Sequence, residues 1–206
     1  MTKSSFFFLC QTLGEAHVYV TNAIFRHLGR PPFLTCPVEY CADRSVPSVE
    51  ESPYLRILGQ GLEEDIGVFW TGKSVVSKTI TKDEVLEIGV VLKRKPVLWD
   101  NLHANDYDQQ RMYLGPYSGR EPDIIPHIRG VLSNPNCEYT LNVPALFTLA
   151  AWSDCYDKTT GEFKEWNPKN ASQWSIPYFL DEIQRSLTAF VTVFLLHVVY
   201  FPHFRL

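Results

Sequence analysis

Short hydrophobic runs alternate with helix-like patterns along most of the chain. The runs lie at 33–36, 66–70, 96–99 and 130–132, and each is bounded by proline, glycine or polar residues. Runs of this length between such residues are typical of strands that are buried on both faces. The sequence therefore predicts four β-strands at these positions.

The region 15–28 has the pattern of a helix that precedes the first strand. Val20, Ile24 and Leu28 follow one another at steps of four, which places them on one side of a helix. Gly29 stands where a helix commonly ends, and two prolines follow it. We therefore expect a helix that stops at about residue 28.

Further helix signals lie between and after the other runs. Ser52 before a proline is typical of a helix start, and this pattern predicts a helix through about residue 62. Thr81 and Glu84 have the spacing of a capping box. A further helix is expected at 143–152.

The alternation of helices and strands predicts the fold class. Buried strands that are separated by helices pair in parallel through right-handed crossovers, so an α/β sheet or barrel is expected. No glycine-rich phosphate-binding motif follows any of the runs, which disfavours a nucleotide-binding sheet.

Composition and charge narrow the function classes. The chain has 206 residues, 45% of them hydrophobic, and a formal net charge of −4. These values are typical of one globular domain, and they disfavour binding to nucleic acid or to an anionic membrane. Aromatic residues make up 14% of the chain. They could build a large core or provide faces on which sugars stack, and composition does not choose between the two.

The cysteines indicate the redox compartment and the chance of a metal site. The five cysteines are odd in number and scattered, which favours a reducing compartment. We expect no metal or cofactor, because no second pair of Cys or His residues stands at the spacing of a metal site.

The apolar runs near the two termini are both short. The run 6–10 is too short for a signal peptide. The run 190–201 is too short for a typical membrane span, so a buried helix or strand is expected, with a tail anchor as the alternative.

Polar residues follow each predicted strand at its carboxyl end, where parallel α/β folds place their chemistry. The most prominent segment, WDNLHANDYD at 99–108, combines an indole with carboxylates and carboxamides. Such a mixture suits a ligand rich in hydroxyl groups. In the alternative interpretation, these side chains cap turns. We favour turn capping for Asp108 and Asn136 and a hydrogen-bonded scaffold role for His103. For Asp106 we favour ligand binding, because it is expected to lie deepest in the polar cluster.

Several of these motifs together resemble a known family. WDNLHANDYDQQRMYLGPYSGR, GVLSNPNCEY and FWTGKSVVSK, with CPVEYC and SPYLR, are similar to the catalytic domain of eukaryotic O-GlcNAcases in glycoside hydrolase family 84. That family removes β-linked N-acetylglucosamine from Ser and Thr of nuclear and cytoplasmic proteins. The resemblance runs from about residue 15 to residue 152.

The resemblance implies the second half of a (β/α)8 TIM barrel, with four of its eight parallel strands. It divides the chain into an unrelated leader at 1–14, a partial barrel at 15–152, and a divergent tail with an apolar C-terminal segment at 153–206. The partners that the resemblance implies are O-GlcNAc-modified proteins in the cytoplasm and nucleus. Charge and the short apolar runs predict no nucleic acid and no membrane, and a homodimer is an expectation for the full-length protein.

The resemblance also implies a set of sugar-binding residues. Asp106 and Asn134 would hold ring hydroxyls, Trp99 and Tyr40 would surround the acetamido group, and Cys36 would lie beneath it. The positions that match the pocket of the family are Tyr40, Thr71, Val75, Trp99, Asn101, Asp106 and Asn134. For Tyr40, the residues alone leave open whether its hydroxyl binds a ligand or its ring fills the rim of the core.

The implied mechanism uses two adjacent Asp residues. The substrate's own acetamido oxygen attacks the anomeric carbon, while one Asp orients that group and the other acts as general acid and then base. The sequence contains no adjacent Asp pair, and Arg44 stands where the family tends to have an aromatic residue. We therefore assign no catalytic residue. The interpretation is an O-GlcNAcase chain without its catalytic pair, and the alternative is a non-catalytic remnant that binds glycans or a partner.

Overall fold

The computed structural model describes residues 10–108 and 110–171, together with residues 176–177, 180–181, 184–185 and 188. The chain divides into two compact units. The sheet unit lies within Met1–Leu102, Ser118–Asn134 and Ser153–Trp166. The loop unit lies within His103–Tyr117, Pro135–Trp152 and Asn167–Leu206.

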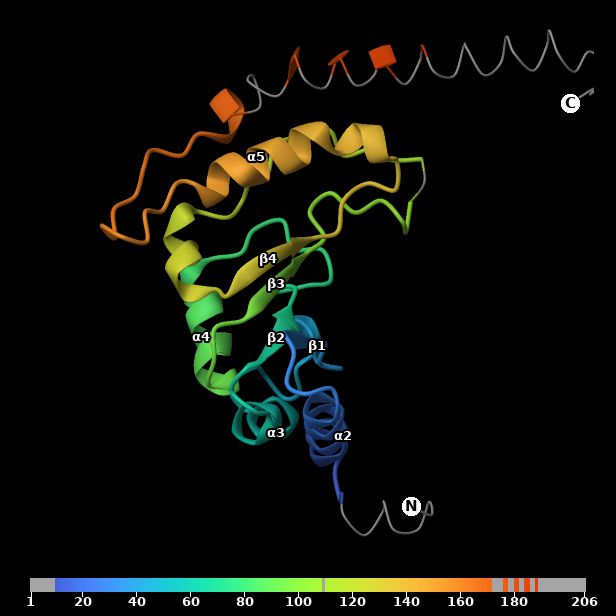
Figure 1. Ribbon diagram of the computed structural model, residues 1–206, viewed down its shortest axis with the longest axis vertical. Helices are drawn as coiled ribbons and strands as arrows, with labels where there is room; N and C mark the ends of the chain where they lie inside the picture. The colour runs from blue at the N-terminus through green and yellow to red at the C-terminus, as the bar shows by residue number, and fades with distance from the viewer. Residues whose placement is uncertain are drawn as a thin grey trace, which may run out of the picture. The chain divides into compact units, whose positions relative to one another are not determined.

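The sheet unit contains four parallel strands in chain order (Figure 1). They are β1 (Phe33–Thr35), β2 (Ile66–Trp70), β3 (Val97–Asp100) and β4 (Gly130–Ser133). In the register, Leu34 lies beside Gly67 and Trp99 beside Leu132. The four predicted strands and their parallel pairing are therefore confirmed.

In the described part of the sheet unit, three α-helices accompany the strands: α2 (Leu13–His27), α3 (Pro53–Gly61) and α4 (Lys82–Leu92). The short 3-10 helices η1 (Ala42–Arg44) and η2 (Pro122–His127) also belong to this unit. Later along the described chain lie η3 (Tyr139–Asn142) and α5 (Val143–Ser153). Helix α3 connects β1 to β2, and α4 connects β2 to β3 (Figure 1). Such helical connections are expected between neighbouring parallel strands.

Side-chain caps fix where the helices begin. The Ser52 hydroxyl accepts a hydrogen bond from the backbone N–H of Leu55, at 3.0 Å. Thr81 begins α4 with a capping box, as predicted. A second capping box at the start of α2, formed by Thr12 and Glu15, was not anticipated, although its spacing is visible in the sequence. Each such cap stabilises a helix by about 1 kcal/mol.

The core of the sheet unit lies between the helices and one face of the sheet. Ile66, Val68 and Trp70 alternate along β2 and are all buried there. Their partners from the helices and loops are Phe25, Val49, Tyr54, Leu55, Leu58, Leu62, Ile88 and Leu92. Apolar burial of this kind is the main stabilising contribution to the unit.

The expectation that every strand is buried on both faces is wrong for β1 and β4. Leu34 is 42% exposed and Leu132 is 41% exposed, whereas β2 is buried throughout. Alternate side chains of a strand point to opposite faces, and the helices described in the sheet unit cover only one of them. Phe69 and Trp99 meet edge to face on the other side, with ring centroids 5.1 Å apart.

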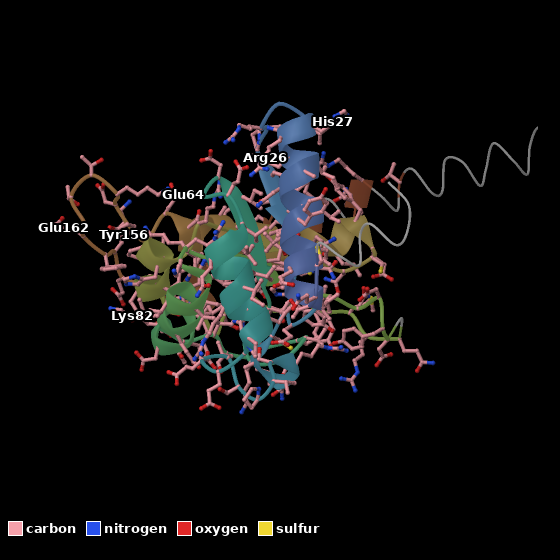
Figure 2. All side chains as sticks on the ribbon, turned by 90° about the horizontal axis from the view of Figure 1, so that it is seen from below. Arg26, His27, Glu64, Lys82, Tyr156 and Glu162 are labelled. Atoms are coloured by element: carbon pink, nitrogen blue, oxygen red, sulfur yellow. The ribbon has the colours of Figure 1, made fainter. Side chains whose placement is uncertain are left out.

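The apolar residues that revealed α2 do not face the core. Val20, Ile24 and Leu28 are exposed, whereas Asn22 and Phe25 are buried. Asn22 joins α2 to the end of α3, because its amide donates to the Gly61 carbonyl (2.8 Å) and its oxygen accepts from the Glu63 N–H (3.1 Å). Figure 2 shows Arg26 and His27 at the end of this helix. The spacing thus predicted the helix but not its buried face.

The apolar run 190–201 lies outside the described residues. In the part of the chain that the structure describes, no helix has the length and the hydropathy that a membrane span requires.

A half-buried histidine links α2 to β1 and α3. His17 Nδ1 lies 2.8 Å from the Tyr54 hydroxyl, and Nε2 lies 2.8 Å from the Thr35 hydroxyl. The same tyrosine hydroxyl accepts a hydrogen bond from the backbone N–H of Val38, at 2.9 Å. Burial lowers the pKa of His17. The neutral ring therefore holds these three elements together.

This pKa shift predicts a pH dependence of stability. With a lower pKa in the folded state, the unfolded state takes up the proton first, so the contribution of His17 is present above about pH 6.5 and is lost as the pH falls below it. Chemical denaturation at pH 7 and pH 5 should show a larger loss of unfolding free energy for the native chain than for a His17→Gln variant. Equal losses in the two proteins would contradict this prediction.

Candidate functional site

The sheet unit contains six of the seven predicted site residues, all at or near the carboxyl ends of its strands. They come from the loop after β1 (Tyr40), from the segment after β2 (Thr71 and Val75), from the end of β3 and the residue after it (Trp99 and Asn101), and from the residue after β4 (Asn134). Parallel strands bring these ends to one edge of the sheet.

Asn101 joins the ends of β3 and β4. Its oxygen accepts hydrogen bonds from the Trp99 indole N–H and from the Asn134 amide, each at 3.0 Å. Its own amide donates to the Val75 carbonyl at 2.7 Å. One buried side chain thus holds the indole, the Asn134 carboxamide and the loop after β2. This bonding indicates that Asn101 positions its neighbours.

Thr71 joins the loop after β1 to the end of β2. Its backbone N–H donates to the Tyr40 carbonyl at 2.9 Å, and its hydroxyl donates to the Ser74 carbonyl at 2.8 Å and lies 3.3 Å from the Tyr40 carbonyl. The Thr71 side chain is buried. Its bonds within the chain therefore fix the loop that carries Tyr40.

The side chain of Arg44 lies over the ring of Tyr40. The guanidinium carbon is 4.9 Å from the ring centroid, within the range of a cation–π interaction. A positive charge therefore covers a face of Tyr40 at the position where the family tends to have an aromatic residue. Cys36, which was expected beneath the sugar, directly follows β1 and is exposed.

A buried ion pair supports the end of β3. Arg120 Nε and Nη2 donate to the two carboxylate oxygens of Asp100 at 2.7 and 2.8 Å, and both side chains are fully buried. The remaining donors reach the carbonyls of Ser77 (2.7 Å), Lys78 (2.9 Å) and Ser118 (3.1 Å). The pair therefore fixes the segment after β2 against the end of β3. A single sequence contains no signal for this pairing.

The backbone beside Arg120 also approaches this segment closely. Gly119 has a φ of +73°, and a Cβ added to it would lie 2.2 Å from the Lys78 carbonyl oxygen. Its own carbonyl accepts a hydrogen bond from the Ile80 N–H at 2.9 Å. Glycine is the one residue that combines this conformation with this approach.

The seventh predicted residue, Asp106, belongs to the loop unit, and its burial was predicted wrongly. Asp106 does not lie deepest in its polar segment, because it is exposed and the neighbouring Asn105 is fully buried. Among the residues that the structure describes, the Asp106 carboxylate has no ion-pair or hydrogen-bond partner. Its oxygens are therefore available to a ligand.

Buried asparagines hold the loop unit together. Asn105 donates to the Arg111 carbonyl and to the Glu138 carboxylate, each at 2.8 Å, and accepts from the Cys137 N–H at 2.7 Å. Asn136 and Asn142 bond to each other and to the backbone around them. The carboxamide of Asn136 is thus bonded within the chain, but to Tyr113 and Asn142 and not to its own turn, so these bonds differ from the expected turn capping. Asn105 and Asn142 were missed, because nothing in their spacing distinguishes a buried amide from an exposed one.

Asp108 and His103 make the kinds of hydrogen bond that were expected of them. Asp108 accepts a hydrogen bond from the Gln110 N–H at 3.3 Å and pairs with Arg111 at 2.9 Å. His103 is buried, and its Nε2 lies 2.9 Å from the Gly115 carbonyl. In the described part of the chain, no group of three or more His, Cys, Asp or Glu residues could hold a metal ion.

The sequence is similar to that of known proteins over most of its length. A model of the β-N-acetylglucosaminidase family matches residues 2–191. Protein O-GlcNAcase of Rattus norvegicus is 51% identical over 142 residues, which is 68% of this chain and 16% of the relative, and that of Mus musculus matches in the same proportions. The chain therefore spans only a small part of the length of these relatives.

A solved structure is similar over most of the chain. A mutant form of the O-GlcNAc hydrolase of Thermobaculum terrenum has a TM-score of 0.73 and 28% sequence identity, and the match covers 87% of this chain and 37% of that one. The similar solved structures are TIM-barrel enzymes of glycoside hydrolase family 84, and each match covers only part of the chain of the enzyme. The expected partial α/β barrel is thereby confirmed.

Proposed function

Because this chain belongs to the β-N-acetylglucosaminidase family, we propose that it supplies the sugar-binding part of a protein O-GlcNAc hydrolase. The substrate class is β-linked N-acetylglucosamine on Ser and Thr of proteins. The activity itself is that of a complete catalytic domain, to which the residues of this chain contribute recognition and orientation.

The observation that carries the proposal is the bonding of Trp99 and Asn134 to Asn101 at the ends of β3 and β4. An indole offers a flat apolar face to the acetamido methyl group, while a carboxamide offers directional partners to ring hydroxyls. Because both side chains are held by a third, they lose little conformational entropy when a sugar binds.

In the proposed mechanism, these residues orient the substrate and do not transfer protons. The acetamido oxygen attacks the anomeric carbon only when the group lies close beneath that carbon, and such positioning can contribute several kcal/mol. The Asp106 carboxylate would accept hydrogen bonds from ring hydroxyls. The general acid belongs to the adjacent Asp pair of the family, which this sequence does not contain.

A second candidate function is glycan or partner binding without hydrolysis. The lack of an adjacent Asp pair favours it for the 206-residue chain taken alone. The two candidates share the sugar-binding residues and differ in whether those residues act together with a catalytic pair.

The proposed location is the cytoplasm and nucleus, where O-GlcNAc-modified proteins occur. The five cysteines of the chain are all free, which suits a reducing compartment. Fluorescence microscopy of a tagged chain tests this proposal, and a signal confined to the secretory pathway would contradict it.

The test of the function is a hybrid that joins the preceding part of the rat catalytic domain to this chain at Glu15. We expect the hybrid to release N-acetylglucosamine from an O-GlcNAc-modified peptide. A folded hybrid that binds the sugar without hydrolysing it would favour the second candidate function, and a folded hybrid that does neither would contradict both.

In the same hybrid, Asp106→Ala should weaken the binding of methyl β-N-acetylglucosaminide by about 1.5 to 3 kcal/mol, the range for a hydrogen bond to a charged group. Calorimetry measures the affinity. The matched control is Asp108→Ala, since that carboxylate lies two residues away and is bonded within the chain. Equal affinities of the two variants would return Asp106 to a turn-capping role.

A further inference from the structure

A groove lies between α3 and α4 on the surface of the sheet unit. Its volume is about 590 Å³. α3 contributes Arg56 and Gln60, and α4 contributes two rows of residues that are four apart. The residues that line it are Glu50, Arg56, Gln60, Asp83, Leu86, Glu87, Val90, Val91 and Lys93.

Two of the residues that line this groove are apolar and exposed. Val90 is 77% exposed and Leu86 is 40% exposed, one turn apart on α4. The two helices approach closely beneath them, since a Cβ added to Gly59 would lie 2.3 Å from the Val91 carbonyl oxygen. The walls of the groove are therefore fixed, and the exposed valine and leucine form a row with helical spacing.

Carboxylates gather at the end of the groove where both helices begin. Glu50 precedes α3, Asp83 lies in the first turn of α4, and Glu87 lies one turn further along. In the described part of the chain, none of the three has an ion-pair partner within 4.0 Å. Burial and the carboxylates of Glu50 and Glu84 raise the pKa of Glu87. A cation that enters here would relieve this repulsion.

The opposite end of the groove has the opposite charge. Lys93 follows the last turn of α4 and is exposed. Arg56 brings one positive charge to the acidic end, where its guanidinium donates to the backbone carbonyl of Glu50, so the three carboxylates still leave that end negative. The groove thus has a negative end, an apolar middle and a positive end.

We propose that this groove binds an amphipathic helix of a partner protein that has lysines or arginines in one terminal turn and apolar residues four apart along one face. The ridge of such a helix fits between two neighbouring helices, and its apolar side chains would cover Leu86 and Val90. Its cations would pair with Glu50, Asp83 and Glu87. The proposal is independent of sugar hydrolysis.

The test uses the 206-residue chain and two blocked helical peptides. One peptide has three lysines in a terminal turn and leucines at steps of four, and in the other the lysines are replaced by glutamates. Fluorescence anisotropy should show saturable binding of the lysine peptide and at least about tenfold weaker binding of the glutamate peptide. Methyl signals of Leu86 and Val90 should shift with the lysine peptide in NMR spectra.

Two variants of the chain locate the binding. Val90→Asp should weaken the binding of the lysine peptide at least about tenfold. The fold should persist in this variant, because the Val90 side chain is exposed. The pair Glu50→Lys with Glu87→Lys should reverse the preference between the two peptides. The matched control is Glu64→Lys, since Glu64 is an exposed carboxylate outside the groove (Figure 2).

Three results would overturn the proposal. The first is the absence of saturable binding by the folded chain. The second is binding that Val90→Asp and the double lysine variant leave unchanged. The third is a dimer that Val90→Asp dissociates, since sedimentation would then assign the groove to a second copy of this chain.

Discussion

Replacing Arg120 with methionine is expected to lower the free energy of unfolding by about 3 to 5 kcal/mol. The substitution leaves the buried Asp100 carboxylate without its bidentate partner, and it also removes the donors that bind the Ser77, Lys78 and Ser118 carbonyls. Urea denaturation measures the change.

Two further variants separate the loss of the ion pair from a general disturbance. Arg120→Met combined with Asp100→Leu should recover part of the loss, because it removes the unpaired buried charge. Arg30→Met breaks an ion pair between an exposed arginine and the half-buried Glu63, whose atoms lie 2.7 Å apart, and should cost about 1 kcal/mol or less. Similar losses for Arg30→Met and Arg120→Met would contradict the role given to Arg120.

The 206-residue chain by itself is expected not to hydrolyse a chromogenic β-N-acetylglucosaminide. A general acid contributes a factor of about 10² to 10⁴ in rate, and the sequence lacks the adjacent Asp pair from which the family takes it. The measurement is release of the chromophore against a blank without protein.

Hydrolysis that an O-GlcNAcase inhibitor abolishes would contradict this prediction. A carboxylate of this chain would then have to act as the acid. Asp106→Asn would test the exposed candidate, whereas Asp100 is buried and paired with Arg120. Loss of hydrolysis in the Asp106→Asn variant would give that residue a catalytic role.

The order and type of the elements could be predicted from the sequence because their signals are local. Strand β2 has the predicted bounds, and the caps at Ser52 and Thr81 begin α3 and α4 as expected. The burial of Leu34 and Leu132 could not be predicted, because it depends on what covers the second face of the sheet.

Site residues could be predicted as positions but not as contacts. The motifs selected Trp99, Asn101 and Asn134, but only the structure shows that Asn101 binds the other two. Arg120 lies within the longest motif and was still missed as a support. Its partner Asp100 is twenty residues away along the chain, and a pairing of this kind depends on the three-dimensional fold.

The most direct test of the proposed recognition is an NMR titration of the 206-residue chain with methyl β-N-acetylglucosaminide. Signals are assigned with the variants Trp99→Phe and Asn134→Ala, and methyl β-glucoside, which lacks the acetamido group, is the reference ligand. We expect saturable shifts of the Trp99 indole N–H and the Asn134 amide with the first sugar and much weaker shifts with the second. Equal responses to both sugars, or shifts that leave these two side chains unaffected, would contradict the assignment of this site to N-acetylglucosamine.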